Sequence, residues 1–277
     1  PLEFLKAITC DFSTKSVLGE GGFGVVYKGV LRSGKVIAVK KLFERCLKED
    51  IFQNEVRYLM GIKHQNIVQF LGYCAESSWE AIEQPSGSGK FIFGELPKRL
   101  LCFEYVSNKS LDKHIYDVSS GLEWNMRYEI IKGICNGLHF LHEECHIIHL
   151  DLKPQNILMD NSMVPKIADF GLSRIFGEQQ TRIITENRTG TSGYMAPEYL
   201  IQGVVSNKAD IFSLGVTLIE IITGGRDYPY FHQDSPDHYA TNSREKYAQQ
   251  VKQCVTIALK CVDPIMEKRP TAKDIMQ

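Results

Sequence analysis

The hydrophobic pattern of this 277-residue chain changes near residue 106, and that change limits the possible folds more than any other feature. Before it, short runs rich in β-branched residues, such as Val25–Tyr27 and Val36–Val39, predict strands. A single amphipathic helix is expected among them, over about 48–60. After it, helical periodicity predicts three longer helices, at 127–144, 206–224 and 245–261. Strands first and helices second indicate an α+β protein with two lobes.

Glycines gather just before the first predicted strand pair, in the stretch 19–24. Gly19, Gly21 and Gly24 would let backbone amides approach phosphate oxygens, because no Cβ stands in the way. A dinucleotide-binding turn requires a helix directly after its glycines, whereas a strand is expected here at 25–30. The pattern favours a hairpin that covers a nucleotide, and a glycine hairpin without a ligand is the simpler alternative.

A lysine on the next predicted strand, Lys40, is a candidate phosphate ligand. Most lysines on strands are solvated surface charges. Here a partner is available, because Glu55 falls on the apolar stripe of the expected helix, between Ile51 and Leu59. A carboxylate at such a position is costly unless it is paired. We therefore expect the two residues to form an ion pair.

The strongest pattern is the ordered polar set around Asp151. Asp151 is followed by Lys153 and Asn156, and Asp169 comes eighteen residues after Asp151, in the sequence Asp-Phe-Gly. Phosphoryl transfer needs a carboxylate to orient the attacking hydroxyl, a lysine near the moving phosphate, and oxygen ligands for Mg²⁺. All these residue types occur in the required order, so a chance match of the whole set is rare.

The overall composition excludes several other classes of protein. Apolar residues make up 43% of the chain and charged residues 23%, which is typical of globular rather than disordered or fibrous proteins. The net charge of −1 gives no support to nucleic acid or an anionic membrane as the main partner. No apolar run approaches the ~20 residues that a membrane span needs. The eight cysteines are irregularly spaced, and we expect reduced thiols of a cytoplasmic protein.

A competing pattern, His142-Glu-Glu-Cys-His146, matches the zinc-protease motif H-E-x-x-H. That motif requires both histidines on one continuous helix. The helix is expected to end near Glu144, because Ile147–Ile148 predicts a strand, and histidines on either side of a helix end do not share a face. The sequence therefore disfavours both a metalloprotease and a structural zinc site.

With these motifs the chain resembles a eukaryotic protein kinase, and specifically a plant receptor-like kinase of the group similar to interleukin-1-receptor-associated kinases. The resemblance runs from about Phe12 to Thr271. It includes Gly-Glu-Gly-Gly-Phe-Gly-Val-Val-Tyr-Lys-Gly at 19–29, Asn-Lys-Ser-Leu-Asp at 108–112 and Gly-Thr-Ser-Gly-Tyr-Met-Ala-Pro-Glu-Tyr at 190–199. The form Asp-Leu-Lys-Pro-Gln-Asn at 151–156 is that of serine/threonine kinases, since tyrosine kinases lack the lysine there.

The resemblance implies a role for each matching residue. Asp151 would be the catalytic base, and Lys153 would contact the transferred phosphate. Lys40, paired with Glu55, would bind the α- and β-phosphates of ATP. The Mg²⁺ ligands would be Asn156 and Asp169. The other residues expected at the nucleotide are Gly19, Gly21, Gly24, Val26, Ala38, Phe103, Glu104, Val106, Asp112 and Leu158.

The resemblance also implies structural contacts around this site. Asp210 would brace the catalytic loop, Glu198 would pair with Arg269, and Thr191 would lie against the catalytic aspartate and lysine. A stack of side chains would run through the kinase, formed by Leu59, Phe70, His149 and Phe170.

Three features depart from the usual kinase pattern. Leu150 stands where many kinases carry an arginine before the catalytic aspartate, which makes the chain a "non-RD" type. The connection over 76–97 is unusually long; its part 84–90 is polar and flexible by composition, whereas Phe91–Phe93 is apolar enough to pack against another surface. The region 225–244 lacks helical periodicity, which puts a substrate-docking helix there in doubt.

The resemblance thus implies a single kinase domain over 1–277, with an N-lobe over 1–103, a C-lobe over 104–277 and a truncated C-terminal end. The implied function is Mg²⁺-dependent transfer of the ATP γ-phosphate to Ser/Thr hydroxyls of protein substrates, in signalling with receptor or co-receptor kinases. A nucleotide-binding scaffold with little catalysis is the alternative. We expect a cytoplasmic location and no membrane segment in this chain; a span that precedes residue 1 in a longer gene product stays open.

Overall fold

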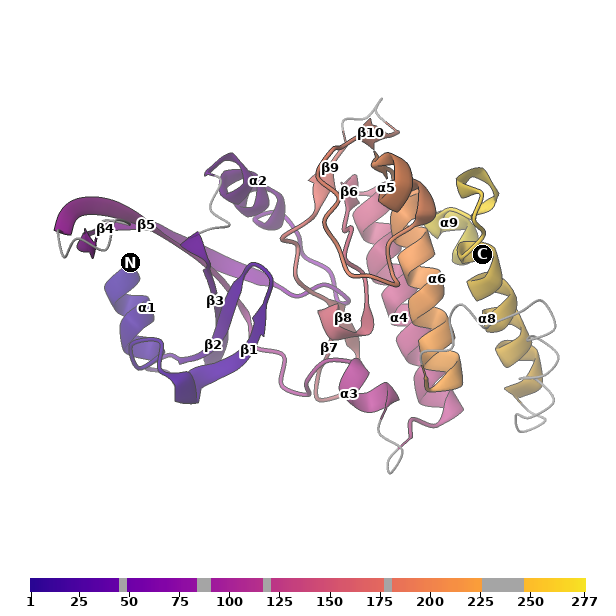
Figure 1. The fold of residues 1–277 in the computed structure, drawn as a ribbon. Coiled ribbons are helices and arrows are strands. Elements are labelled where there is room, and N and C mark those ends of the chain that lie inside the picture. Colours follow the sequence, from indigo (N-terminus) through magenta and orange to yellow (C-terminus); the bar gives the residue numbers. More distant parts are fainter. Residues whose placement is uncertain (45–48, 84–90, 117–120, 177–180, 226–246) are drawn as a thin grey trace. The chain divides into compact units, whose positions relative to one another are not determined.

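The structure, a computed structural model, describes residues 1–44, 49–83, 91–116, 121–176, 181–225 and 247–277. The chain divides into two compact units, one of residues 1–63 and 69–105 and one of residues 64–68 and 106–277. Strands dominate the first unit and helices the second, which confirms the α+β class (Figure 1). The expected lobe boundary after Phe103 falls two residues before the first unit ends.

The first unit is built on an antiparallel sheet of five strands in the order β1-β2-β3-β5-β4 (Figure 1). The predicted runs at Val25–Tyr27 and Val36–Val39 form the cores of neighbouring strands. The strands are β1 (Val17–Gly21), β2 (Gly24–Val30), β3 (Val36–Leu42), β4 (Phe70–Glu83) and β5 (Phe91–Glu104), and a 3₁₀ turn (η1, Thr14–Ser16) precedes them.

An N-terminal helix, α1 (Leu2–Ile8), covers one face of this sheet. Its Leu2, Leu5 and Ile8 are buried in a core that includes Val39 and Cys102. The expectation of a single helix in the first hundred residues is therefore wrong. The spacing of three between the apolar residues was the available signal, but a helix of seven residues gives too short a pattern to stand out.

The second helix of this unit, α2 (Glu49–Leu59), confirms the helix expected over about 48–60. Its Phe52, Val56 and Leu59 are buried. The Phe52 ring packs edge-to-face on the Tyr73 ring, with 6.1 Å between centroids. Because side chains alternate along a strand, Tyr73 lies on the sheet face opposite to Cys74, which packs with α1.

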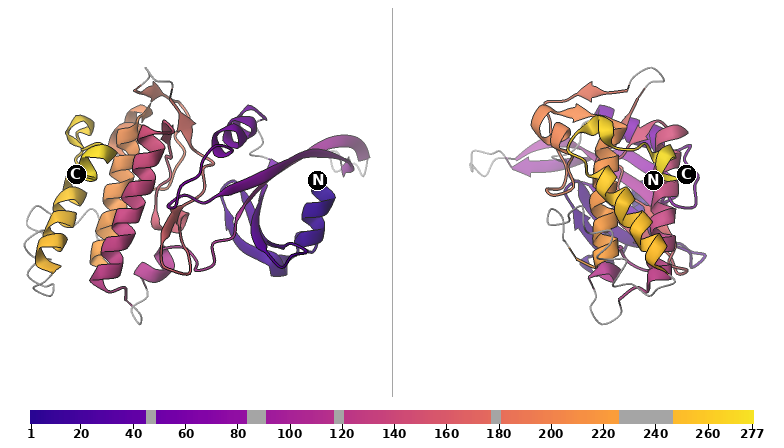
Figure 2. Two further views of the ribbon diagram at one scale, coloured as in Figure 1. Left: turned by 180° about the vertical axis from the view of Figure 1, so that it is seen from behind. Right: turned by 90° about the vertical axis from the view of Figure 1, so that its right-hand side faces the viewer.

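Strands β4 and β5 have fourteen residues each and pair from Phe70 with Phe103 to Glu83 with Phe91. The long connection expected over 76–97 is thus mostly an extension of these strands into a two-stranded ribbon (Figures 1 and 2). The polar part at 84–90 lies outside the described residues. The side chains of the apolar run after it are exposed, by 63% at Phe91, 49% at Ile92 and 77% at Phe93.

The second unit is built around three long helices, α4 (Trp124–Glu143), α6 (Asn207–Thr223) and α8 (Ala248–Cys261). They match the helices predicted at 127–144, 206–224 and 245–261, although residues 245–246 lie outside the described part. Helices α4 and α6 run side by side in the views of Figures 1 and 2 and pack against each other. The shorter elements are α3 (Asp112–Ile115), β6 (Ile147–Ile148), η3 (Pro154–Asn156), β7 (Ile157–Met159), β8 (Pro165–Ile167), β9 (Arg174–Ile175), β10 (Ile183–Ile184), α5 (Pro197–Gln202), β11 (Val204–Val205), η5 (Met266–Lys268) and α9 (Ala272–Ile275).

Helix α6 is the buried centre of the second unit, since all its residues from Ala209 to Ile222 are buried. Ser206 occupies the predicted N-cap position, but its hydroxyl bonds to the Met266 sulfur instead of capping the helix. Gly224 ends the helix in the left-handed conformation, with φ of 78°, as is common for glycine at this position.

The described cysteines are free thiols: Cys10, Cys74, Cys102, Cys135, Cys145, Cys254 and Cys261. Burial raises the pKa of the Cys102 thiol to about 11 and that of Cys135 to about 12. These two side chains therefore stay protonated at neutral pH and behave as small apolar groups of the core.

Close packing of α4 on Pro165 of β8 and on Asn66 predicts the effect of substituting Gly133 in the helix. A Cβ at Gly133 would lie 2.6 Å from a ring carbon of Pro165 and 2.8 Å from the Asn66 amide nitrogen. Gly133→Ala gains helix propensity, but we expect a net loss of about 1–3 kcal/mol in the free energy of unfolding, because overpacking dominates. Denaturant unfolding measures this, with Gly61→Ala as the control, since nothing lies within 4 Å of its Cβ position. Equal stability of the two variants would contradict the packing.

Candidate active site

The buried carboxylate of Asp210 fixes the backbone of the loop that carries Asp151. Asp210 stands in the first turn of α6 and is fully buried. Its Oδ2 accepts a hydrogen bond from the N–H of His149 at 2.7 Å, and its Oδ1 accepts one from the N–H of Leu150 at 2.8 Å. His142 Nε2 also lies 2.9 Å from Oδ2. The expected brace is thus confirmed, and it acts on the two amides directly before Asp151.

Two residues of the site hold left-handed backbone conformations, Leu150 with φ of 66° and Asp169 with φ of 65°. Such a conformation costs about 1–3 kcal/mol at a residue other than glycine and persists only where the surroundings impose it. At Leu150 the hydrogen bond to Asp210 and the burial of the side chain impose it. Left-handed residues also occur away from the site, at Cys10, Asp11 and Phe12 among others, so the strain at Leu150 and Asp169 agrees with a functional site without being unique to it.

The side chains of Asp151, Lys153, Asn156 and Thr191 form one hydrogen-bonded cluster. Lys153 Nζ lies 2.7 Å from Asp151 Oδ2, and Asn156 Nδ2 donates to the same oxygen at 2.8 Å. The Thr191 hydroxyl donates to Asp151 Oδ1 at 2.6 Å and accepts from Lys153 Nζ at 2.6 Å. The structure therefore brings three predicted site residues together and places a hydroxyl between the carboxylate and the ammonium.

The imidazole of His149 joins this loop to the segment that carries Asp169. Its Nε2 lies 2.9 Å from the Ala168 carbonyl oxygen, and its Nδ1 accepts a hydrogen bond from the Asp151 N–H at 3.2 Å. A carbonyl only accepts, so the ring proton is on Nε2. The ring packs edge-on to Phe170 with 5.1 Å between centroids, which gives half of the expected stack. The other half, Leu59 and Phe70, belongs to the first unit.

The two candidate metal ligands are brought close by the backbone. The N–H of Ala168, directly before Asp169, donates to the Asn156 carbonyl oxygen at 2.8 Å. Asn156 uses its amide nitrogen to bind Asp151, which leaves its amide oxygen as the group able to bind a cation. An amide oxygen and a carboxylate are ligands that suit Mg²⁺.

In the first unit, the predicted nucleotide residues share one face of the sheet. The register pairs Val26 with Lys40 and Ala38 with Phe103. Paired residues on neighbouring strands point to the same side, and so do residues two apart on one strand. Val26, Ala38, Lys40 and Phe103 therefore lie on the face opposite to the one that α1 covers.

Lys40 is buried, with 7% of its surface exposed, and its ammonium lies 5.8 Å from the centre of the Phe23 ring. Phe23 belongs to the glycine-rich turn between β1 and β2. Glu55 lies on α2, but its side chain is outside the described part of the structure, so the expected ion pair between Lys40 and Glu55 stays a prediction.

The fold requires glycine at only one of the three predicted positions, Gly24. A Cβ at Gly24 would lie 2.2 Å from the Lys41 carbonyl oxygen, so the strand pairing itself excludes a side chain there. Nothing described lies within 4 Å of a Cβ at Gly19 or Gly21. At these two positions the described fold gives no reason for glycine, whereas close approach of a ligand would.

The remaining predicted nucleotide residues are divided between the units. Glu104 ends the first unit's β5, and its carboxylate accepts from the Gln69 N–H at 2.9 Å while its own N–H donates to the Gln69 carbonyl. In the second unit, Leu158 on β7 forms a β-bridge with Ser110, whose hydroxyl donates to Asp112 Oδ1 at 2.5 Å. This places Leu158 and Asp112 close to each other, with Val106 half-buried before them.

The structure gives the zinc pattern no support. Helix α4 ends at Glu143, so His142 lies inside the helix and His146 lies beyond its end. His142 is buried against Asp210 instead. Within the described residues, no group of three or more His, Cys, Asp and Glu side chains is arranged to hold a metal ion.

One network near the site has no counterpart in the sequence analysis. Glu220 of α6 is buried, and the Tyr194 hydroxyl lies 2.9 Å from both of its carboxylate oxygens. The Tyr116 hydroxyl, just after α3, donates to Glu220 Oε2 at 2.6 Å. The signal was a carboxylate inside a strongly apolar helix, but only the fold reveals that tyrosines are its partners.

A second buried ion pair anchors the segment after Thr191. Arg269 is 2% exposed, and its guanidinium binds both carboxylate oxygens of Glu198, at 2.7 and 2.8 Å. The Arg269 guanidinium also lies over the Phe212 ring, 5.0 Å from its centre. The expected pair of Glu198 and Arg269 is confirmed.

Comparison with known proteins identifies the family of this chain. The model of the protein kinase domain matches residues 12–277. The chain belongs to the protein kinase domain family. It is 38% identical over 99% of its length to receptor-like serine/threonine-protein kinase SD1-7 of Arabidopsis thaliana, and 39% identical over 99% to cysteine-rich receptor-like protein kinase 19 of the same plant. A putative serine/threonine-protein kinase receptor of Brassica oleracea var. viridis is 35% identical over 99% of the chain.

This protein kinase domain spans 34% of the first of these relatives, 43% of the second and 33% of the third. The relatives are named as receptors or receptor-like kinases. Over the described residues of this chain, no helix combines the length and apolar character that crossing a membrane would take.

The brace by Asp210 leads to a stability prediction. Asp210→Ala leaves two buried backbone N–H groups without an acceptor, and we expect it to lower the free energy of unfolding by about 2–5 kcal/mol. Asp160→Ala is the matched control, because Asp160 Oδ1 also accepts two backbone N–H bonds, from Ser162 and Val164, but in a partly exposed turn. Chemical denaturation compares the two, and an Asp210 variant no less stable than the Asp160 variant would contradict the brace.

Proposed function

We propose that this chain is a protein serine/threonine kinase domain that transfers the γ-phosphate of ATP to Ser and Thr hydroxyls of proteins. The observation that carries the proposal is the position of the Thr191 hydroxyl between the Asp151 carboxylate and the Lys153 ammonium. A substrate hydroxyl that takes this place has an acceptor for its proton and a cation beside its oxygen. The names of the relatives agree with Ser/Thr as the acceptor.

Within this proposal each part of the cluster has a chemical task. Asp151 orients the attacking hydroxyl and accepts its proton at Oδ1 as the oxygen bonds to phosphorus and the bond to the ADP oxygen breaks. Lys153 stabilises negative charge on the transferred phosphoryl group. On the sheet face of the first unit, Lys40 would bind the nucleotide phosphates, and the amides near Gly19 and Gly21 would cover them.

Asn156 and Asp169 are the residues we propose for Mg²⁺. Two oxygen ligands are few, but Mg²⁺ is usually held by one or two protein groups together with substrate phosphates and water. When bound with ATP, the ion would neutralise charge on the phosphates. Asn156 would present its amide oxygen, since its nitrogen is committed to Asp151.

The receptor-like relatives support a role in receptor-type signalling. We propose protein substrates that carry Ser or Thr, and other receptor or co-receptor kinases as partners. The chain would then work on the cytoplasmic side of a membrane. Because Leu150 stands before Asp151, we propose the non-RD type. We also propose the group that resembles interleukin-1-receptor-associated kinases, on the motifs that the chain shares with it.

Substitution of either aspartate separates catalysis from nucleotide binding. We expect Asp151→Asn to lower kcat by about 10²–10⁴, because the amide cannot accept the proton, with ATP affinity unchanged. We expect Asp169→Asn to lower both kcat and the affinity for Mg·ATP. Transfer of labelled phosphate to a generic Ser/Thr substrate measures kcat, and calorimetry measures ATP binding. Asp160→Asn, in a partly exposed turn, is the control. If the Asp151 variant transfers phosphate at nearly the wild-type rate, the assignment is wrong. If the wild-type chain binds ATP but transfers no phosphate, the alternative of a nucleotide-binding scaffold is favoured.

Because Leu150 stands before Asp151, we expect catalysis to depend only weakly on phosphorylation of the loop 173–189. The leucine is buried and cannot pair with a phosphate, and the Arg174 guanidinium is already bonded to the Leu172 and Ser173 carbonyls. We expect the combined change Thr181→Ala, Thr185→Ala and Thr189→Ala to lower kcat less than about tenfold. The Thr189 backbone bonds to the Tyr199 hydroxyl survive this change. A hundredfold loss with intact ATP binding would mean that another cation accepts a loop phosphate.

A further inference from the structure

Among the residues that the structure describes, no strand pairs with the outer side of β4, so one edge of the first unit's sheet is open there. In the order β1-β2-β3-β5-β4, strand β4 is an edge strand, and β3 pairs with β5 only from Leu100 to Glu104. Residues 71–81 of β4 are largely exposed. An exposed edge strand of this length is a template for pairing with another strand, and proteins usually shorten or cover it.

The residue opposite Ser77 shows which backbone groups of β4 face outward. Ser77 pairs with Pro97 of β5, and a proline has no N–H to give to the ladder. Proline is therefore accommodated at a pair that exchanges no hydrogen bonds. In an antiparallel ladder such pairs alternate with hydrogen-bonded ones, so the N–H and C=O of Ala75, Ser77, Trp79 and Ala81 point to the open edge.

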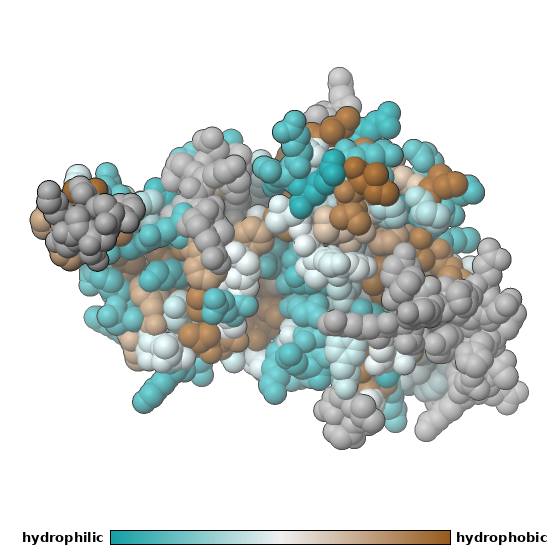
Figure 3. Space-filling model, in the orientation of Figure 1, coloured by the Kyte–Doolittle hydropathy of each residue, from teal (hydrophilic) through white to brown (hydrophobic). Residues whose placement is uncertain are grey.

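The side chains of these same residues lie on one face of the ribbon, together with Arg99, Glu95 and Phe93 of β5, which pair with Ala75, Trp79 and Ala81. Trp79 is 69% exposed and Phe93, which pairs with Ala81, is 77% exposed. Apolar residues are visible at the end of the ribbon in Figure 3. Large aromatic side chains exposed on a folded domain are the kind of group that interaction sites use.

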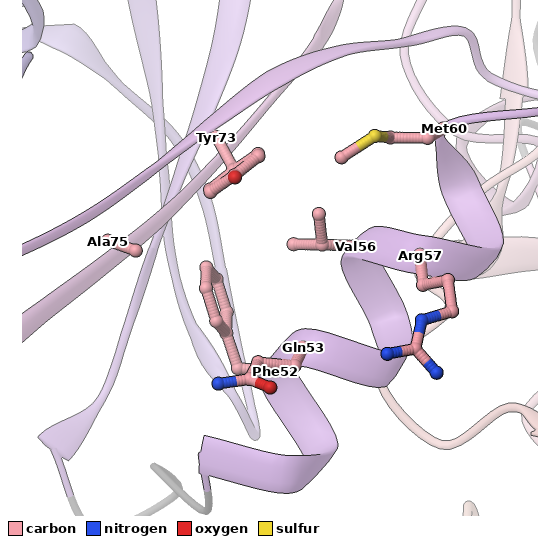
Figure 4. A pocket seen from close by; sticks show the side chains of 7 residues that line it. All are labelled: Phe52, Gln53, Val56, Arg57, Met60, Tyr73 and Ala75. Atoms are coloured by element: carbon pink, nitrogen blue, oxygen red, sulfur yellow. The ribbon is translucent and has the colours of Figure 1, made fainter.

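At the root of the ribbon the same face opens into a pocket of about 380 Å³ between α2 and β4 (Figure 4). Its lining is mainly apolar, and Tyr73 and Ala75 supply the strand side. Figure 4 shows the Phe52, Val56 and Met60 side chains reaching toward these two residues from the helix. Trp79 is four residues beyond Ala75 on the same strand, about 13 Å along it, and it is not among the residues that line the pocket of its own chain.

Two acidic residues limit how β4 could pair with itself. Two copies of β4 that pair antiparallel are related by a two-fold axis, and the residue on this axis is the centre of the pair. A centre at position 76 would place Glu76 against Glu76 of the other copy, and a centre at 78 would place Glu76 against Glu80. Like charges directly opposite each other destabilise a pair. A centre at Ser77 sets Glu76 against Ser78 and Glu80 against Cys74, and it sets Trp79 against Ala75 and Ala81 against Tyr73. This register puts each tryptophan at the other copy's pocket, which centres at 75 and 79 do not.

We propose that two copies of this chain associate through β4, antiparallel about a two-fold axis at Ser77, with the Trp79 indole of each copy in the pocket of the other. Outward backbone groups at Ala75, Ser77 and Trp79 supply the hydrogen bonds of the new ladder. The indole supplies most of the buried apolar area, as a large aromatic anchor does in many interfaces. This proposed interface lies in the first unit, and the proposal does not depend on phosphate transfer.

Sedimentation of the full 31.5-kDa chain over a range of concentrations tests the association. We expect a species of twice this mass to become detectable as the protein concentration is raised to about 100 μM. Ser77→Pro removes an outward N–H without touching the ladder to β5, and Trp79→Ser removes the anchor; each is expected to weaken the dimer at least tenfold. Ile201→Ser, at a similarly exposed position in the second unit, is the control and should leave the dimer unchanged. A monomeric wild type, or variants that dimerise like it, would overturn the proposal.

Cysteine cross-linking tests the register itself. In the proposed pair the two Ser77 Cα atoms are about 5.5 Å apart, within the range that a disulfide bridges. Under mild oxidation Ser77→Cys should give a covalent dimer above the wild-type background. Ser78→Cys should not, since Ser78 faces Glu76 of the other copy. Equal cross-linking of the two, or cross-linking at position 78 only, would contradict the register, whereas circular dichroism checks that both variants are folded.

Discussion

The second unit depends on one buried carboxylate. Asp210 sits at the start of the most buried helix, and it holds the amides of His149 and Leu150 with both oxygens. These hydrogen bonds hold Leu150 in a left-handed backbone conformation, and they position Asp151 so that its carboxylate contacts Lys153. The helix core thus fixes a loop that local propensity alone would leave variable.

The site was predictable where chemistry limits the choice of residue. Carboxylate, lysine and amide in a fixed order around Asp151 allow few interpretations, and the cluster that forms around Thr191 agrees with them. Long helices were predictable too, because Gly224 stops α6 and periodicity marks its apolar length. Sequence reasoning could not supply the partners of Glu220, since the two tyrosines come from distant segments.

The fold differs from the expectation where pairing overrides local composition. Residues 76–97 are expected as a long connection between two strands, with a polar loop at 84–90, yet β4 and β5 pair along most of this range. Strand propensity depends strongly on such context. Helix α1 was missed for a related reason: it gains its stability from packing on Val39 and Cys102 rather than from its own seven residues.

The central claim is that the chain transfers phosphate rather than only binding nucleotide. Its most direct test is phosphoamino-acid analysis of a generic protein substrate after incubation with the chain, Mg²⁺ and ATP labelled at the γ-phosphate. The account predicts label on serine and threonine, and its loss when Mg²⁺ is chelated. Tight ATP binding measured on the same preparation, with no label on any residue, would contradict it.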